Sequence, residues 1–347
     1  MSQTALLYLL IGTAIGPSWV NTEVVNQPSR SQGVVAPDTR LEKLFDAGCV
    51  VTEGVAIGLD GMIYFSDITF GETCRSSKGT EAGHIWKYDP NNGKATVFRS
   101  PSGMSNGIKF DAEGNMIVAE GADFGGRRIT RTDMQTGKSY TITGLYNGRP
   151  YNSPNDLCLD EKGRIYFTDP RYVGHEPIEQ PVMGVYRIDL DGSSHLIITD
   201  AGKPNGIAIS PDQRTLYVAS NDNGVVGQLP KGLSGYKGRM ALLAYDLAMD
   251  GSARFRETLV DFTQNGGPPD GLTVDVEGNV YVAVSDLSQP GIHVYSHRGQ
   301  RLAIIPILAP SNVSFGRGDT KRVLYITAGK SLYRIQTIKE GYHLPLR

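Results

Sequence analysis

The sequence predicts an all-β protein folded as a six-bladed β-propeller, with four-stranded antiparallel blades around a central site. Three observations carry this prediction. Glycine is abundant, at 42 of 347 residues, and clusters of Gly, Asp and Asn recur as turns between short apolar segments. One hairpin pattern occurs six times. Its copies recur at roughly 40–50 residues, the spacing of propeller blades that have four strands each.

Each copy of the hairpin has a polar residue, an alternating apolar strand, a turn and a second apolar strand. The copies are TEGVAIGLDGMIYFSD, SNGIKFDAEGNMIVAE, PNDLCLDEKGRIYFTD, PNGIAISPDQRTLYVAS, PDGLTVDVEGNVYVAV and SNVSFGRGDTKRVLYITA. The polar residues, here called the anchors, are Glu53, Asn106, Asn155, Asn205, Asp270 and Asn312. Innermost strands of all blades start at one end of the channel, so the anchors should converge around one axial site. The alternative is that each anchor only caps its strand.

The segment after each hairpin supplies the outer strands of its blade. These segments are HIWKYDPNNGKATVF, RRITRTDMQTGKSYTI, GVYRIDLDGSSHLII, LLAYDLAMDGSARFRETLV, GIHVYSHRGQRLAII and SLYRIQTIKEGY. Because little chain follows the sixth hairpin, we expect a strand near Arg40 to Phe45 to join the last blade and close the ring. GVVGQLPKGLSGYKGR, within the longest interval between anchors, is interpreted as a loop insertion on one face.

The N-terminal segment, residues 1–38, is interpreted as a leader and linker before a single propeller domain at 39–347. ALLYLLIGTAI has the length of a signal-peptide core, yet no Lys or Arg precedes it. It is short for a membrane span. A cleaved leader would place the protein in the periplasm or outside the cell; without one it would be cytoplasmic.

Charge and cysteine content exclude several classes of protein. The formal net charge is −2, which gives no support for a nucleic acid or an acidic membrane surface as partner. The three cysteines, Cys49, Cys74 and Cys158, are odd in number and fit no zinc module, so the sequence indicates no disulfide framework. Cys158 lies within a strand pattern and is expected to be a small buried apolar residue.

Four anchors have the chemistry of a metal site. Glu53 and Asp270 are anionic, and Asn155 and Asn205 offer amide oxygens. Two negative charges balance one divalent cation, and an all-oxygen donor set favours calcium, with Mg²⁺, Mn²⁺ and Zn²⁺ as alternatives. Zinc is disfavoured because none of the six histidines is an anchor.

The stretch NSPNDLCLDEKGRIYFTDP strongly resembles the signature of the gluconolactonase/regucalcin (SMP-30-like) family. The TEG opening, the PNG and PDG anchors, RRITR and GRPYNSPND also resemble bacterial gluconolactonases, over about residues 53–333. The resemblance implies a six-bladed propeller with an axial divalent metal. Two departures concern the substrate: Gly121 and Ala122 follow Glu120 where the bacterial enzymes often have His-Gly, and Ser153 stands where animal relatives have Arg.

By the same resemblance, the family's metal ligands fall on Glu53, Asn155, Asn205 and Asp270. The metal would polarise the carbonyl of a sugar lactone, with Asp270 as the general base that activates water. Asn106 and Asn155 would orient substrate hydroxyls. Asp156 would support Asn155 through a hydrogen bond, or alternatively cap its own strand.

Two other functions stay open on the sequence. One is a lactonase or phosphotriesterase-like hydrolase of broader specificity. The other is a non-catalytic propeller that binds a ligand or protein on its loop face and holds a structural metal, since one fold hosts many functions. The presence of all four expected metal ligands argues against the second alternative. The expected partner is therefore a small lactone.

Overall fold

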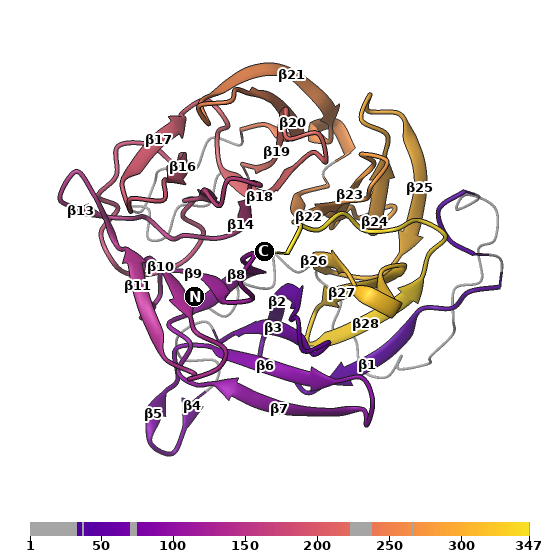
Figure 1. Cartoon of the computed structure of the whole chain (residues 1–347), viewed down its shortest axis with the longest axis horizontal. Helices are drawn as coiled ribbons and strands as arrows, with labels where there is room; N and C mark the ends of the chain where they lie inside the picture. The colour runs from indigo at the N-terminus through magenta and orange to yellow at the C-terminus, as the bar shows by residue number, and fades with distance from the viewer. Residues whose placement is uncertain (1–32, 37, 70–74, 223–237, 266, 347) are drawn as a thin grey trace.

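The computed structural model describes residues 33–36, 38–69, 75–222, 238–265 and 267–346. Within them, six four-stranded antiparallel sheets stand side by side around a central axis (Figure 1). The predicted six-bladed β-propeller is therefore confirmed. The leader and most of the predicted insertion lie outside the described residues, so both stay predictions.

The six repeated hairpins form the two inner strands of the six blades. The innermost strands are β2 (Val51–Ile57), β8 (Ser105–Phe110), β14 (Leu157–Leu159), β18 (Pro204–Ile209), β22 (Pro269–Val274) and β26 (Pro310–Phe315). The second strands are β3 (Ile63–Ile68), β9 (Met116–Glu120), β15 (Ile165–Thr168), β19 (Thr215–Asn221), β23 (Val280–Val284) and β27 (Val323–Ala328). Each pairs with its partner through a tight Gly- or Asp-containing turn, as the repeat predicts.

The outer strands come from the segments that follow the hairpins. The third strands are β6 (His84–Asp89), β10 (Arg128–Thr132), β16 (Val185–Ile188), β20 (Met240–Leu247), β24 (Gly291–Tyr295) and β28 (Ser331–Gln336). The outermost strands are β7 (Lys94–Arg99), β11 (Ser139–Thr143), β17 (Ser194–Ile198), β21 (Ala253–Asp261), β25 (Arg301–Pro306) and β1 (Glu42–Asp46). Minor hairpins pair β4 (Arg75–Ser76) with β5 (Gly79–Thr80) and β12 (Leu145–Tyr146) with β13 (Arg149–Pro150). Two single-turn 3-10 helices are η1 (Thr263–Asn265) and η2 (Gly318–Thr320).

The ring is closed by the N-terminal strand, as predicted. β1 pairs antiparallel with β28, so the last blade combines the start and the end of the propeller. A bidentate ion pair between Arg334 and Glu42, at 2.8 and 3.2 Å, joins the same two strands. This pairing covers the sheet edge that an open propeller would expose. Opening the ring would require separating the two strands.

The hydrophobic core is divided among the six interfaces between blades. Each buried apolar cluster of the described chain combines residues of two neighbouring blades, as with Tyr64 of β3 and Phe110 of β8. The inner strands are buried on both faces by this packing. This explains why they have nearly continuous apolar sequences, whereas the outermost strands keep an exposed face.

The C-terminal segment after β28 crosses the ring toward its axis (Figure 1). Tyr342 donates its backbone N–H to Val274 O at 3.1 Å, and its hydroxyl donates to Glu161 at 3.1 Å and accepts from Gln213 at 2.9 Å. His343 bonds through Nε2 to Gly316 O at 2.9 Å. The segment thus joins blades three to six at the end of the channel opposite the anchors. The sequence repeat gave no indication of this crossing.

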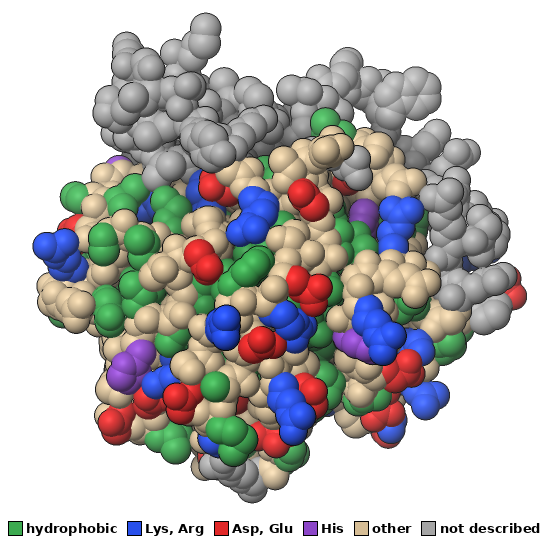
Figure 2. Space-filling model, turned by 90° about the horizontal axis from the view of Figure 1, so that it is seen from above, with side chains coloured by type: hydrophobic (Ala, Val, Ile, Leu, Met, Phe, Trp, Pro, Cys, Tyr) green, Lys and Arg blue, Asp and Glu red, His purple; other side chains and the backbone are tan. Residues whose placement is uncertain are grey.

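The structure corrects one prediction about the cysteines. Cys49 is disulfide-bonded. Spacing alone could not show this, because a disulfide depends on residues brought together in space. Cys158 is free and buried, as expected. The described part of the chain has no helix long and apolar enough to cross a membrane. Acidic and basic side chains are interspersed along the rim of the ring (Figure 2).

Candidate active site

The six anchors lie at the same end of the six innermost strands. Five lie inside their strands, and Asn155 lies two residues before β14. Each innermost strand contacts the next around the ring, and β26 contacts β2. Bonds between blades fix the anchor backbone: Asn106 O accepts from Ser66 Oγ at 2.7 Å and Asn155 O from Gly107 N at 2.7 Å. The predicted convergence of these positions on the axis is present in the fold.

Crowding at the axis explains the glycine that follows four of the anchors. A Cβ atom on Gly54 would overlap the backbone oxygen of Asn106, and one on Gly206 would overlap that of Asp270. A Cβ atom on Gly107 would overlap Asp156, and one on Gly271 would overlap the side chain of Asn312. Only glycine lets the backbones approach this closely. The Glu-Gly, Asn-Gly and Asp-Gly pairs of the sequence are therefore contacts between neighbouring blades and not turns.

The third blade differs because Asp156 occupies the position that glycine has in four other blades. Asp156 is fully buried, and its Oδ1 accepts the N–H of Leu157 at 2.8 Å. Its Oδ2 is buried and has no hydrogen-bond partner in the described structure. The bond to Leu157 agrees with the strand-cap interpretation, and the expected support of Asn155 stays a prediction. Asp156 also adds a third carboxyl group to the axis.

Three carboxyl groups therefore share the site and influence one another: Glu53 and Asp156 are buried, and Asp270 is half-buried. Burial raises the pKa of Glu53 well above its usual range, and the charges of Asp270 and Asp156 raise it further. Burial and then the charge of Asp156 raise the pKa of Asp270 to about 7. Burial also raises the pKa of Asp156. These shifts show that like charges are held together in a poorly solvated space.

Two asparagine side chains partly offset this repulsion. Asn312 Oδ1 accepts the N–H of Val313 at 2.8 Å, which leaves its NH₂ group for the carboxylates. Asn312 accordingly favours the charged forms of Glu53 and Asp156. Asn205 does the same for Asp270 and lowers its pKa. Neutral amides reduce the cost of this acidic cluster but do not balance its charge.

The donor set fits a divalent cation. Among the described residues, no Lys or Arg forms an ion pair with Glu53 or Asp270. No group of three His, Cys, Asp or Glu side chains in the described chain is arranged to hold a metal. A metal at this ring would therefore need amide oxygens from Asn155 and Asn205 beside the carboxylates. Such a mixed oxygen set is what calcium accepts.

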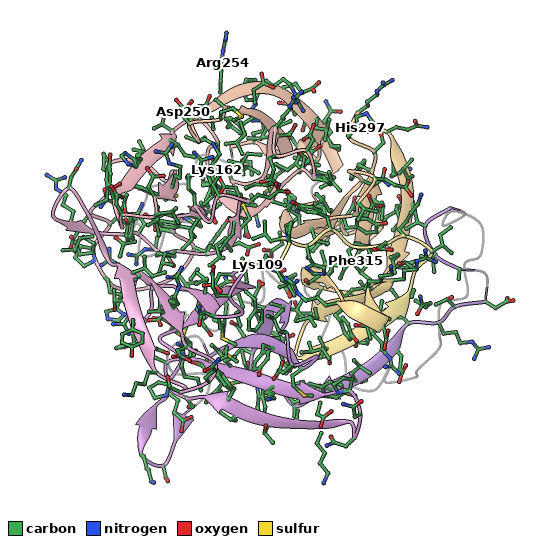
Figure 3. All side chains as sticks on the ribbon, viewed as in Figure 1. Lys109, Lys162, Asp250, Arg254, His297 and Phe315 are labelled. Atoms are coloured by element: carbon green, nitrogen blue, oxygen red, sulfur yellow. The ribbon has the colours of Figure 1, made fainter. Side chains whose placement is uncertain are left out.

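Sequence reasoning missed two residues beside the ring. Lys109, on β8 and close to the axis in Figure 3, favours the charged form of Asp156. Tyr172, in the loop between β15 and β16, accepts a hydrogen bond from Asn205 Nδ2 at 3.3 Å. The alternating pattern of β8 indicates that Lys109 faces inward, but a single lysine in a strand does not by itself indicate a functional site. Tyr172 lies outside the repeat, so no pattern could have found it.

The histidines lie away from the anchors, as their sequence positions suggest. His293 is buried on β24, where it bonds to Gln289 O at 2.8 Å and to the Tyr295 hydroxyl at 3.2 Å. His297 lies at the rim of the ring in Figure 3. His293 and His297, although only four residues apart in the sequence, therefore do not form a shared site.

The family model described as "SMP-30/Gluconolactonase/LRE-like region" matches residues 52–330. The chain belongs to this family. It is 32% identical to a gluconolactonase of Zymomonas mobilis over 258 residues, which are 70% of this chain and 65% of the relative. The solved gluconolactonase of Xanthomonas campestris is 27% identical, with a TM-score of 0.70 over 87% of this chain and 90% of that one.

A calcium-binding regucalcin of Agrobacterium tumefaciens has a TM-score of 0.67 over 89% of this chain and 97% of its own length. Its identity to this chain is 17%, so this likeness shows the fold alone. The family match confirms the resemblance drawn from the third hairpin and the anchors. The matched residues include the inner hairpins of all six blades, whereas β28 and β1, the two outer strands of the last blade, lie outside them.

Proposed function

We propose that this protein hydrolyses the ester bond of a small sugar lactone with the help of one divalent cation, for which calcium is favoured. The observation that carries the proposal is the axial cluster of Glu53, Asp156 and Asp270, in which no Lys or Arg of the described chain forms an ion pair with Glu53 or Asp270. Structures do not retain such a cluster for stability, because like charges in a desolvated space are costly. The gluconolactonases among its relatives support the choice of lactones.

Glu53, Asn155, Asn205 and Asp270 would hold the cation. When bound, a divalent cation polarises the ester carbonyl and stabilises the negative charge that develops on its oxygen. The residues of the chain supply the remaining functions. Asn106 and Asn155 orient the hydroxyl groups of the sugar, which keeps the ester at the ring.

Asp270 is the proposed general base. It removes a proton from the attacking water and returns it to the alkoxide that leaves when the ring opens, so water and lactone give a hydroxy acid. Burial and the charge of Asp156 raise the pKa of Asp270 in the chain without a metal. A bound divalent cation would lower this pKa and keep the carboxylate ionised, as a general base requires.

Proton release during hydrolysis tests the proposal directly. Gluconolactone and a panel of other lactones are supplied to the metal-loaded protein, and the rate is compared with that after chelator treatment and corrected for spontaneous hydrolysis. We expect catalysis that disappears with chelator and returns with calcium. The panel also separates a narrow sugar lactonase from a lactonase of broad specificity.

The alternative of a non-catalytic propeller predicts a different result. In that case the rates would equal the spontaneous rates for every lactone, with or without chelator, while a ligand could still bind at the loop face. Asp250→Asn is a suitable control variant for this assay. Asp250 lies at the rim of the ring, far from the axis in Figure 3, and bonds locally to Ser252.

A further inference from the structure

Tyr172 makes two hydrogen bonds that connect it to the ring of anchors. Its hydroxyl donates to the backbone oxygen of Asn221 at 3.3 Å and accepts from Asn205 Nδ2 at 3.3 Å. Asn221 ends β19, and Asn205 is the anchor of β18 in the same blade. Tyr172 itself belongs to the loop of the preceding blade. The phenol thus connects two blades beside the axial carboxylates.

These bonds determine which way the Asn205 amide faces. A backbone oxygen can only accept, so the Tyr172 proton is committed to Asn221. The phenol oxygen is then left as an acceptor, and Asn205 must present its NH₂ group to it. The carboxylate of Asp270 is also an acceptor, and Asn205 favours its charged form. Both neighbours therefore require the NH₂ group, which leaves Oδ1 of Asn205 for a cation.

Lys203 holds the Tyr172 ring in place. Its Nζ lies 4.6 Å from the centre of the ring, and the residue is 2% exposed. Its backbone oxygen accepts the N–H of Asn221 at 2.9 Å, so the same lysine contacts the Tyr172 ring and one hydrogen-bond partner of its hydroxyl. A buried ammonium over a ring face is an attractive contact that resists rotation of the tyrosine.

We propose that Tyr172 is a positioning residue, packed by Lys203, that fixes the Asn205 amide with its carbonyl oxygen toward the cation at the ring. This inference rests on the proposed function, because it assumes that a divalent cation binds there. Without the hydroxyl, the amide could rotate, and half of its orientations would present NH₂ groups to the cation. Residues that orient metal ligands typically change metal affinity about 10- to 100-fold when they are removed.

The test is calorimetric titration of calcium into chelator-treated protein. Tyr172→Phe keeps the ring and its contact with Lys203 but removes the hydroxyl, and we expect a dissociation constant about tenfold higher. Tyr186→Phe is the matched control: Tyr186 lies in the same blade, is fully buried, and its hydroxyl has no partner in the described structure. Its removal should leave calcium affinity unchanged. Excess calcium should restore the lactonase rate of Tyr172→Phe to within about threefold of wild type.

A double-mutant cycle separates positioning from general damage. In an Asn205→Ala background, Tyr172→Phe should cause no further loss of calcium affinity, because no amide is left to orient. Lys203→Arg keeps the positive charge but alters the packing over the Tyr172 ring, so it should raise the dissociation constant by about threefold and keeps the test decisive if Tyr172→Phe folds poorly. Unchanged affinity in Tyr172→Phe, or equal losses in both backgrounds, would overturn the inference alone. Absence of calcium binding by the wild type would overturn the proposed function and this inference together.

Discussion

The two ends of the central channel carry opposite charges. At the anchor end, the buried Glu53 and Asp156 and the half-buried Asp270 lie close enough for their charges to act on one another. At the other end, Arg317 acts on His343, lowers the pKa of its imidazole, and raises the electrostatic cost of bringing a cation there. The difference teaches that the cation site follows from gathering carboxyl groups at the anchor end, whereas an acid at the other end, Glu161, accepts a hydrogen bond from Tyr342.

The two ends also differ in how the chain closes them. Anchors are held by bonds between neighbouring blades, such as the one from Thr168 Oγ1 of β15 to Asn205 O of β18 at 2.6 Å. The opposite end is crossed by the C-terminal segment, which bonds to several blades through Tyr342 and His343. Lys109 lies between the two, and its charge acts on both Asp156 and His343.

The largest expected effect comes from removing the proposed base at the acidic end. Asp270→Asn should lower the rate of lactone hydrolysis by about 10³-fold, because the amide cannot accept a proton from water. The melting temperature in chelator should be equal to or above that of wild type, since one buried like charge is gone. Initial rates and thermal melts measure both quantities. Wild-type rates in this variant would remove Asp270 from the mechanism.

The opposite ends should respond to pH with opposite signs. Asp270 has a pKa of about 7 in the folded chain and an ordinary value of 3.8, so between these values only the folded chain holds the proton. Its contribution to stability therefore falls as pH rises from about 4 to 7. His343 has a pKa lowered by burial to about 4 from 6.5, and Arg317 and Lys109 contribute to the lowering. Its contribution is present above pH 6.5 and is lost as pH falls toward 4, by at most about 3 kcal/mol.

Thermal melts in chelator between pH 4.5 and 8 check this contrast. The melting temperature of Asp270→Asn relative to wild type should rise with pH. That of His343→Phe relative to wild type should rise as pH falls, because the variant has no imidazole to protonate. Parallel pH curves for all three proteins would mean that neither group titrates as described.

Lys109 lies between the two ends, so removing its charge should change the affinity of the acidic end for a cation. Removing a positive charge near the acidic end should favour binding of a cation there by about 1 kcal/mol, or about fivefold. Calcium titration of Lys109→Met at pH 8 measures this effect. Lys162→Met is the control, since Lys162 is a surface residue that bonds to Met249 O at 2.6 Å. Weaker calcium binding in Lys109→Met would contradict the proposed placement of the charge.

The smallest expected effect concerns the closed end. Tyr342→Phe removes hydrogen bonds to Glu161 and Gln213, which together are worth about 1 kcal/mol. The melting temperature should fall by about 2 °C, and lactone hydrolysis should not change. Tyr140→Phe, an exposed tyrosine on β11, should change neither. A loss of activity in Tyr342→Phe would show that the two ends are coupled.

The sequence predicted the parts of the molecule that repeat. Six hairpins, the closing strand and the convergence of Glu53, Asn205 and Asp270 follow from periodicity, because every blade places its first strand in the same way. Asp156 was visible as an irregularity in the third hairpin. The sequence did not show that Asp156 stands where four other blades have a glycine at a close contact between neighbouring blades. That could be recognised only from the distances between the blades.

Features made by contacts between unlike segments were not predictable. Tyr172 reaches Asn205 from a loop of a different blade, and its role depends on a backbone oxygen that no side chain reveals. The disulfide of Cys49 and the crossing of Tyr342 likewise join segments whose separation along the chain carries no pattern. Such contacts depend on the packed fold and not on local periodicity.

Calcium titration of chelator-treated wild type and Glu53→Gln tests the central claim, that the acidic end holds a divalent cation. Glu53 lies in the ring, and Glu113, an exposed residue outside it, provides the control Glu113→Gln. The account predicts one calcium ion per chain in wild type and in Glu113→Gln, with affinity at least about 100-fold lower in Glu53→Gln. Equal affinity in all three proteins, or no binding of calcium, magnesium or manganese by wild type, would contradict it.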